Sequence, residues 1–298
     1  MMTETIPAGG QLYQVGNYGL CLYRTGSGRP TVVFLPGAGM FGLGYYNLHQ
    51  RTAAFATSVL YDRSGTGWSD DVSLPRSAGD VARELHDLLA AADLPGPYVF
   101  VAHSLGGIYA RRFAQLFPRE VAGLLLLDPA HEDYSANEPE VARQAAEAWK
   151  NQPMPEFTPE MLEGYRPILG AMYAAWPAEV REPLIDRHIT RFKAGLLESG
   201  NVDAIYDEIR HGGAVPVVPT VVFTALGIDA TQLAFNSEEV VRAQNQAKLV
   251  TNTAYVESVP GAEHRVLQEA SHVMIHTQHA DEVIGALRDV IARGKSGD

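Results

Sequence analysis

A serine lies where an apolar stretch gives way to a helical one, in residues 98–107 (Tyr-Val-Phe-Val-Ala-His-Ser-Leu-Gly-Gly). The apolar residues before the serine are typical of a buried parallel strand, and residues 108–114 after it favour a helix. A serine at the tip of such a sharp turn exposes its hydroxyl, provided that the residues two before and two after it are small. Those residues are Ala102 and Gly106, with Ala102 standing where glycine is usual. Ser104 is therefore the candidate nucleophile.

The base that would activate this serine has to be found among 10 histidines. A serine hydroxyl is a poor nucleophile unless a neighbouring base takes its proton, and the pKa of histidine suits that role. His272 lies in a late loop shortly before the expected last helix, and we predict it as the base. His276 and His279 are close enough in sequence to be alternatives.

Two aspartates compete to be the acid that orients the histidine. Asp128 comes directly off the apolar run Val121–Leu127, and Asp229 follows the apolar run 219–225. Either carboxylate could hold the imidazole and stabilise its charged form. A residue at the end of a buried strand is held more rigidly than one in a loop, so we predict Asp128 and keep Asp229 as the alternative.

Composition limits the partners and the compartment. The net charge of −12 argues against nucleic acid or an anionic membrane as a partner. The longest apolar run, Val121–Leu127, is too short to cross a bilayer, and residues 1–20 lack the pattern of a signal peptide. The single cysteine, Cys21, excludes an internal disulfide and fits a reducing compartment, so we expect a cytoplasmic protein. The histidine spacing lacks flanking carboxylates, so neither a metal nor a cofactor is predicted.

Strands and helices alternate along the chain. This alternation predicts an α/β fold with a mostly parallel sheet covered on both faces, in which functional groups gather at the carboxyl ends of the strands. A hairpin is expected at the start, over residues 11–15 and 19–24. The other expected strands are Thr31–Leu35, Thr57–Tyr61, the run that leads to Ser104, Val121–Leu127, 219–225 and 255–259, and the expected helices include 77–92, 237–248 and 281–292.

The alternation stops at residues 131–213. This segment carries several helical stretches, many prolines and many aromatic residues, but no clear strand. It is too long for a simple connection and too apolar for disorder. We therefore expect a helical cap inserted into a core of residues 1–130 and 214–298, with some cap aromatics lining a substrate pocket.

Four motifs, in this order, resemble those of the α/β-hydrolase superfamily. They are Leu35-Pro-Gly-Ala-Gly39, Asp62-Arg-Ser-Gly-Thr-Gly-Trp-Ser69, Ala102-His-Ser-Leu-Gly-Gly107 and Ala270-Ser-His272. The resemblance covers nearly all of the chain and implies a serine hydrolase with a helical cap. A tetrahedral oxyanion in such an enzyme needs two preorganised donors. The backbone amides of Leu105 and Ala38 are the expected donors, and Gly37 and Gly39 let the loop around Ala38 fold tightly.

The resemblance also bears on residues beside the expected site. It implies that His103 points away from the nucleophile, and we expect Asp62 and Arg63 to fix their own loop. Most members of the superfamily place the acid where Asp229 stands. The residues around Asp128, however, resemble a bacterial subfamily that often lacks a clear acid at the later position.

These features predict an enzyme that cleaves an ester or lactone bond of a hydrophobic small molecule through an acyl-enzyme. Related scaffolds also hydrolyse carbon–carbon bonds, amides or peptides with an N-terminal proline, and these reactions stay open. Dehalogenase and epoxide hydrolase chemistry is disfavoured because those enzymes use an aspartate where Ser104 stands. A non-catalytic ligand-binding protein of the same fold is a further alternative. The sequence does not indicate an oligomeric state.

Overall fold

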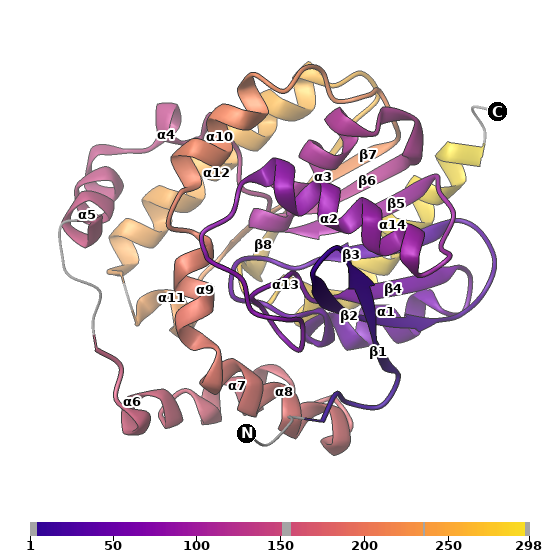
Figure 1. Cartoon of the computed structure of the whole chain (residues 1–298). Helices are drawn as coiled ribbons and strands as arrows, with labels where there is room; N and C mark the ends of the chain where they lie inside the picture. Colours follow the sequence, from indigo (N-terminus) through magenta and orange to yellow (C-terminus); the bar gives the residue numbers. More distant parts are fainter. Residues whose placement is uncertain (1–4, 151–155, 235, 296–298) are drawn as a thin grey trace.

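The computed structural model describes residues 5–150, 156–234 and 236–295, and a sheet of eight strands runs through its centre (Figure 1). The strands are β1 (Gly10–Val15), β2 (Tyr18–Thr25), β3 (Thr31–Leu35), β4 (Thr57–Tyr61), β5 (Tyr98–His103), β6 (Val121–Leu127), β7 (Thr220–Gly227) and β8 (Glu263–Ser271). Their order is β1-β2-β4-β3-β5-β6-β7-β8. The β1-β2 hairpin and the β2-β4 pair are antiparallel, and every pair from β4 to β8 is parallel. The predicted α/β fold with a mostly parallel sheet is confirmed.

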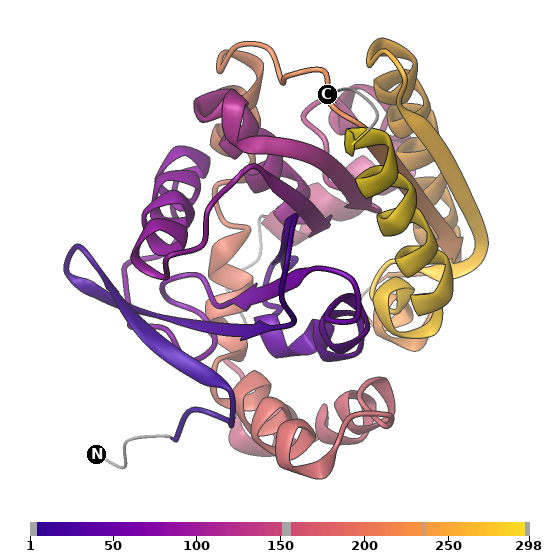
Figure 2. The same ribbon diagram turned by 90° about the vertical axis from the view of Figure 1, so that its right-hand side faces the viewer.

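Helices cover both faces of the sheet. Helices α1 (Tyr46–Thr52) and α14 (Ala280–Lys295) pack on one face, and α2 (Ala78–Ala91), α3 (Leu105–Leu116) and the end of α12 (Glu238–Ser258) pack on the other. In Figure 2 the strands lie between α14, in yellow, and α2, in purple. Burial on both faces explains why the inner strands are continuous apolar runs rather than alternating ones.

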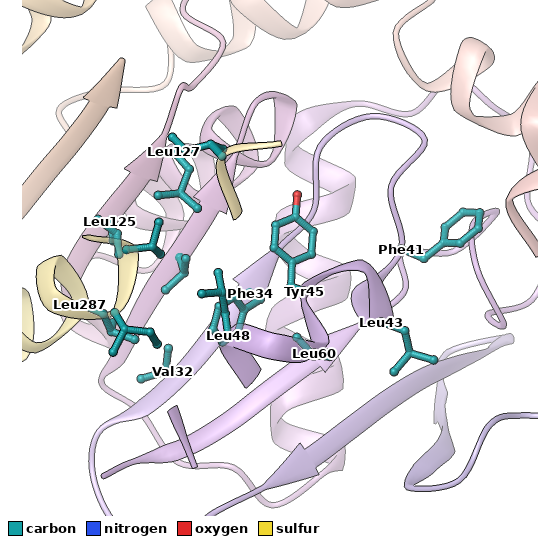
Figure 3. Packing of buried hydrophobic residues seen from close by; sticks show 14 of the residues in the cluster. Val32, Phe34, Phe41, Leu43, Tyr45, Leu48, Leu60, Leu125, Leu127 and Leu287 are labelled. Carbon is teal, nitrogen blue, oxygen red and sulfur yellow. The ribbon is translucent and has the colours of Figure 1, made fainter. Parts of the chain in front are cut away.

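Alternate residues of each inner strand enter different layers of the core. Val32 and Phe34 of β3 pack toward α1 and α14, together with Leu125 of β6 (Figure 3). Leu48 of α1 and Leu287 of α14 close this layer, and all five side chains are almost fully buried. The sheet is therefore a rigid support for the loops at the carboxyl ends of its strands.

The expected last strand over residues 255–259 is wrong. Residues 255–258 are instead the last turn of α12, which begins after the cap residue Ser237 and runs ten residues beyond the expected end at residue 248. The last strand is β8, at the edge of the sheet, where it pairs only with β7. Because β8 is at an edge, it carries many charged and polar residues and lacks the apolar run that marks the inner strands.

In the described part of the segment between β6 and β7, residues 128–150 and 156–219, the regular elements are all helices. They are α4 (Tyr134–Asn137), α5 (Glu140–Lys150), α6 (Pro159–Glu163), α7 (Arg166–Met172), α8 (Ala178–Thr190), α9 (Phe192–Glu198) and α10 (Val202–Arg210). Helices α5 to α8 follow the left and lower margin of the molecule in Figure 1. Helix α10 instead packs against α2 and α3 of the core. The division into a core and a cap stays a prediction.

Not one of the described helices combines the length and the apolar character that a membrane span needs.

Candidate active site

Ser104 occupies a strained turn between β5 and α3. Its backbone has φ 52° and ψ −123°, a conformation that residues with a Cβ rarely adopt. A Cβ on Gly106 would lie 2.2 Å from the carbonyl oxygen of Leu35, and one on Gly107 would lie 2.7 Å from the Cβ of Pro129. Only glycine therefore lets α3 approach β3 and the loop after β6 closely enough to form this turn.

His272 lies between β8 and α13 (Ile275–Gln278), and it bridges the serine and one aspartate. Its Nε2 is 3.0 Å from the Oγ of Ser104, and its Nδ1 is 2.5 Å from the Oδ2 of Asp128. A carboxylate can only accept, so Nδ1 carries the proton and donates to Asp128. Nε2 then keeps its lone pair for the hydroxyl proton of Ser104.

Asp128 follows β6 and is completely buried, with φ 43°. Its Oδ1 accepts the backbone N–H of Ala225 at 3.0 Å, and its Oδ2 accepts the ammonium of Lys248 at 2.5 Å as well as His272. Burial would raise the pKa of Asp128, but the Lys248 charge and the His272 hydrogen bond outweigh it and hold that pKa well below the usual range. Asp128 is therefore an anion.

Asp229 has a different role in the structure. Its Oδ1 accepts the backbone N–H groups of Thr231 and Gln232, and the Oε1 of Gln232 accepts the backbone N–H of Asp229. This capping box starts the short helix α11 (Ala230–Leu233). The two competing aspartates are thus separated by geometry: Asp128 contacts His272, and Asp229 caps a helix.

The other candidate histidines do not face the serine hydroxyl. His103 is buried, accepts the hydroxyl of Tyr45 at Nδ1 (2.7 Å) and donates from Nε2 to the backbone oxygen of His272 (2.9 Å). Burial, followed by the nearby His272 and His276, lowers the pKa of His103 well below its usual value, so it is neutral. His276 is buried against the ring of Tyr45, and burial lowers its pKa to about 3. His279 contacts Glu282.

The two predicted oxyanion donors come from different segments, since Leu105 directly follows Ser104 and Ala38 lies in the loop after β3. Leu105 is the first residue of α3, where backbone N–H groups have no partner inside the helix. Ala38 follows β3 in a loop that passes close to the nucleophile, since a Cβ on Gly37 would lie 3.1 Å from the Cβ of Ser104. Within the described residues the Ala38 amide donates to no acceptor. Their function as donors stays a prediction.

Lys248 is the residue of this site that sequence reasoning missed. It lies on α12 and donates both to Asp128 and to the carbonyl oxygen of Ala225, at 3.1 Å. Nothing in the sequence around Lys248 marks it, because the contact depends on how α12 crosses behind β6 and β7.

Two cavities lie beside these residues. A cavity of about 180 Å³ includes Ser104, Asp128 and His272 in its wall, together with Lys248. A second cavity of about 460 Å³ has Ala38 in its wall, and the segment from α6 to α9 supplies most of the rest. The aromatic and aliphatic residues that line it include Leu162, Tyr165, Leu169, Ile189 and Phe192.

A possible metal-binding group among the described residues lies just beyond Asp128. His131, Glu132 and Asp133 each present a ligand atom, and these atoms lie within 4.8 Å of one another. Both carboxylate oxygens of Glu132 are taken by Arg111, at 2.5 and 2.6 Å, and the Nδ1 of His131 accepts the backbone N–H of Asp133. Both oxygens of Glu132 and the Nδ1 of His131 are therefore already hydrogen-bonded, while the buried Nε2 of His131 has no partner among the described residues.

Comparison with known proteins identifies the family. Residues 32–286 match the sequence model of the Alpha/beta hydrolase family, which is most of the chain. A 2-hydroxy-6-oxononadienedioate/2-hydroxy-6-oxononatrienedioate hydrolase of Paraburkholderia phymatum is 33% identical over 108 residues, which is 35% of this chain and 37% of that protein. The first curated relatives are likewise matched over only 13% to 43% of their own lengths.

Solved structures match nearly the whole chain at low identity. An N-acyl homoserine lactone degrading enzyme, Est816, has a TM-score of 0.62 and 20% identity, covering 94% of this chain and 99% of that one. A thermophilic esterase from Thermogutta terrifontis has a TM-score of 0.58 and 18% identity, covering 96% and 99%. At these identities the likeness concerns the fold.

Replacing Asp128 by Asn is expected to slow the reaction of Ser104 with a fluorophosphonate by up to about 10⁴-fold, as loss of the acid does in a serine–histidine–aspartate triad. The substitution would remove the negative charge that both His272 and Lys248 contact. The asparagine amide could then donate to Nδ1, which would hold the imidazole in the wrong tautomer. The measurement is the second-order rate constant of labelling, after circular dichroism has verified the fold.

Asp229→Asn is the matched control, because asparagine caps a helix about as well as aspartate. Its labelling rate is expected to equal that of the wild type. Loss of labelling in Asp229→Asn together with a normal rate in Asp128→Asn would reverse the assignment of the acid.

Proposed function

The chain belongs to the alpha/beta hydrolase family, and from this premise we propose that it is a serine hydrolase that cleaves an ester or lactone bond of a hydrophobic small molecule. The observation that carries the proposal is the hydrogen-bonded series from Ser104 through His272 to the buried Asp128. A serine, an imidazole and a carboxylate in this order are the parts that acyl transfer requires.

In the first half of the proposed reaction, the Oγ of Ser104 attacks the carbonyl carbon while its proton passes to the Nε2 of His272. The carbonyl electron pair moves to the oxygen, which the amides of Leu105 and Ala38 stabilise. The tetrahedral intermediate then collapses, and Nε2 gives its proton to the departing alkoxide. Asp128 stays ionised and stabilises the imidazolium by its charge.

In the second half, water replaces the alcohol. His272 takes a proton from the water, whose oxygen attacks the acyl carbon of the Ser104 ester. Collapse of the second tetrahedral intermediate returns the proton to the Oγ of Ser104 and releases the acid. The enzyme is regenerated without an oxidant, a reductant or a metal in any step.

The lining of the larger cavity supports a hydrophobic acyl group. Its aromatic and aliphatic side chains come from α6 to α9, and Ala38 links it to the predicted oxyanion loop. An acyl chain in this cavity would remove apolar surface from water while its carbonyl points toward Ser104. The same fold is found in a lactone-degrading enzyme and in an esterase, so it can accommodate this class of reaction.

The direct test of the function is Ser104→Ala. We expect the wild type to hydrolyse p-nitrophenyl esters or lactones and the variant to lose this turnover with an unchanged fold, because no other residue replaces the nucleophile. Steady-state hydrolysis across a broad ester and lactone panel measures it. A wild type inert toward the whole panel, or a fully active variant, would sink the proposal.

The hydrophobic acyl group is tested by Phe192→Ala. Burying a phenylalanine side chain is worth about 1.5–3 kcal/mol, so losing the part that faces an acyl chain is expected to lower kcat/KM for an octanoate ester by roughly 5- to 10-fold. The value for an acetate ester is expected to stay near that of the wild type, since acetate does not reach this wall.

Val250→Ala is the control for Phe192→Ala, because Val250 is an exposed apolar residue of α12 outside this cavity. The Val250→Ala variant should change kcat/KM for neither the octanoate nor the acetate ester. An equal loss for octanoate and acetate in Phe192→Ala would show that the cavity does not hold the acyl chain.

A further inference from the structure

The loop that carries Ala38 is held from the core side by Arg63. Arg63 follows β4 and is almost completely buried. Its Nη1 donates to the carbonyl oxygen of Pro36 at 2.8 Å, and its Nη2 donates to that of Gly37 at 2.9 Å. Arg63 was expected to fix its own loop. It instead fixes the backbone immediately before Ala38.

The same loop is also held by Glu198, the last residue of α9. The Oε2 of Glu198 accepts the backbone N–H of Gly39 at 2.8 Å. Its two oxygens also accept the Nε and Nη2 of Arg63, at 2.7 and 2.9 Å, in a bidentate pair. Glu198 thus binds both the residue after Ala38 and the arginine that holds the residues before it.

Two glycines let α9 rest directly on this loop. A Cβ on Gly195 would lie 2.6 Å from the Cα of Gly39, and a Cβ on Gly39 would lie 3.0 Å from the Cα of Gly195. The backbones are therefore in contact, which brings Glu198 within reach of Gly39. Phe192 and Leu196 of the same helix line the larger cavity.

The energetics of the pair favour a positioning function. Burial would lower the pKa of Arg63, but the charge and hydrogen bonds of Glu198 outweigh it and raise that pKa further. A buried ion pair of this kind often contributes no more to stability than two apolar residues of similar volume, because desolvation offsets the attraction. What apolar residues could not supply are the hydrogen bonds to Pro36, Gly37 and Gly39.

We propose that Glu198 is a positioning residue that, through Arg63 and Gly39, sets the oxyanion loop, so that α9 and the loop carrying Ala38 hold their positions as one unit. This inference rests on the proposed function and adds to it a link between the wall of the acyl cavity and the oxyanion hole. An acyl group that packs on Phe192 and Leu196 holds α9 down, and α9 in turn fixes the amide of Ala38.

Glu198→Gln tests the link. The glutamine amide has no charge and only one acceptor oxygen. Even if that oxygen still accepts Gly39 and the Nη2 of Arg63, the guanidinium loses its counter-charge and the acceptor of its Nε. We expect kcat for an ester to fall by at least about 10-fold, and by no more than the roughly 10²- to 10³-fold lost when an oxyanion donor is removed, with KM changed little. Glu163→Gln is the matched control, since Glu163 pairs with Arg166 in an exposed position of α6, and it should leave kcat unchanged.

A second readout separates positioning from a merely structural function. A trifluoromethyl ketone forms a tetrahedral adduct: the Ser104 Oγ bonds to the carbonyl carbon, its proton goes to His272 and the ketone oxygen becomes the oxyanion. Its inhibition constant is expected to rise in Glu198→Gln by the factor by which kcat/KM falls. A reduced melting temperature with an unchanged inhibition constant would overturn the proposal.

The double variant Arg63→Met/Glu198→Met guards against a folding defect, because it leaves neither charge buried without a partner. We expect it to fold and to lose kcat as Glu198→Gln does. A folded double variant with wild-type kcat overturns the proposal, and failure of both variants to fold makes the pair a structural requirement and overturns it too. An active wild type with an equally active Glu198→Gln removes this proposal alone, whereas a wild type that neither hydrolyses esters nor binds the ketone removes the proposed function.

Discussion

The turn at Ser104 is the constraint on which the arrangement of the site depends. A residue with a Cβ at φ 52° costs about 1–3 kcal/mol, so the surroundings have to hold it there. The backbone N–H of Ser104 donates to the carbonyl oxygen of Leu127 at 3.2 Å. The backbone carbonyl oxygen of Ser104 accepts the N–H of Ala130 at 3.0 Å. These two partners flank Asp128. The nucleophile and the aspartate are therefore joined through the backbone as well as through His272.

Other contacts bring the surrounding loops to the same point. His103 connects the backbone of His272 with Tyr45, and the hydroxyl of Tyr45 accepts the N–H of Gly37 at 3.4 Å. The side chains that make these contacts, His103 and Tyr45, are neutral. The charged side chains near the site are paired with opposite charges. Lys248 offsets Asp128 and Glu198 offsets Arg63. A site built in this way presents fixed dipoles rather than free charges to a substrate, which is the arrangement that electrostatic preorganisation requires.

Residue patterns predicted much of the fold and the contacts of the site, for reasons that are visible in particular residues. The inner strands are apolar on both faces, and the small residues at Gly106 and Gly107 reflect a steric need that any sequence with this turn must meet. The sequence pattern does not reveal the edge strand β8. One edge of this strand faces solvent, and most of its residues are polar. Residues 255–259 do not distinguish a strand from the end of a helix, because a short apolar run fits both.

The choice between Asp128 and Asp229 shows the same limit at the site. Each aspartate follows an apolar strand, and only tertiary geometry reveals that one meets His272 and the other starts a helix. Lys248 and Glu198 had no local signal at all, since their partners lie 120 and 135 residues away in the chain. These ion pairs form only because of the way α9 and α12 pack on the rest of the protein, and the hydrophobic periodicity of a helix does not predict its packing partners.

The central claim is that the acyl group passes through a covalent bond to Ser104. Rapid acid quench of the wild type during turnover of a p-nitrophenyl ester, followed by peptide mapping by mass spectrometry, tests it most directly. The peptide containing Ser104 is expected to gain the mass of one acyl group during turnover and to lose it once the substrate is exhausted. Turnover with no acylated peptide at any quench time, or with the acyl group on another residue, would contradict it.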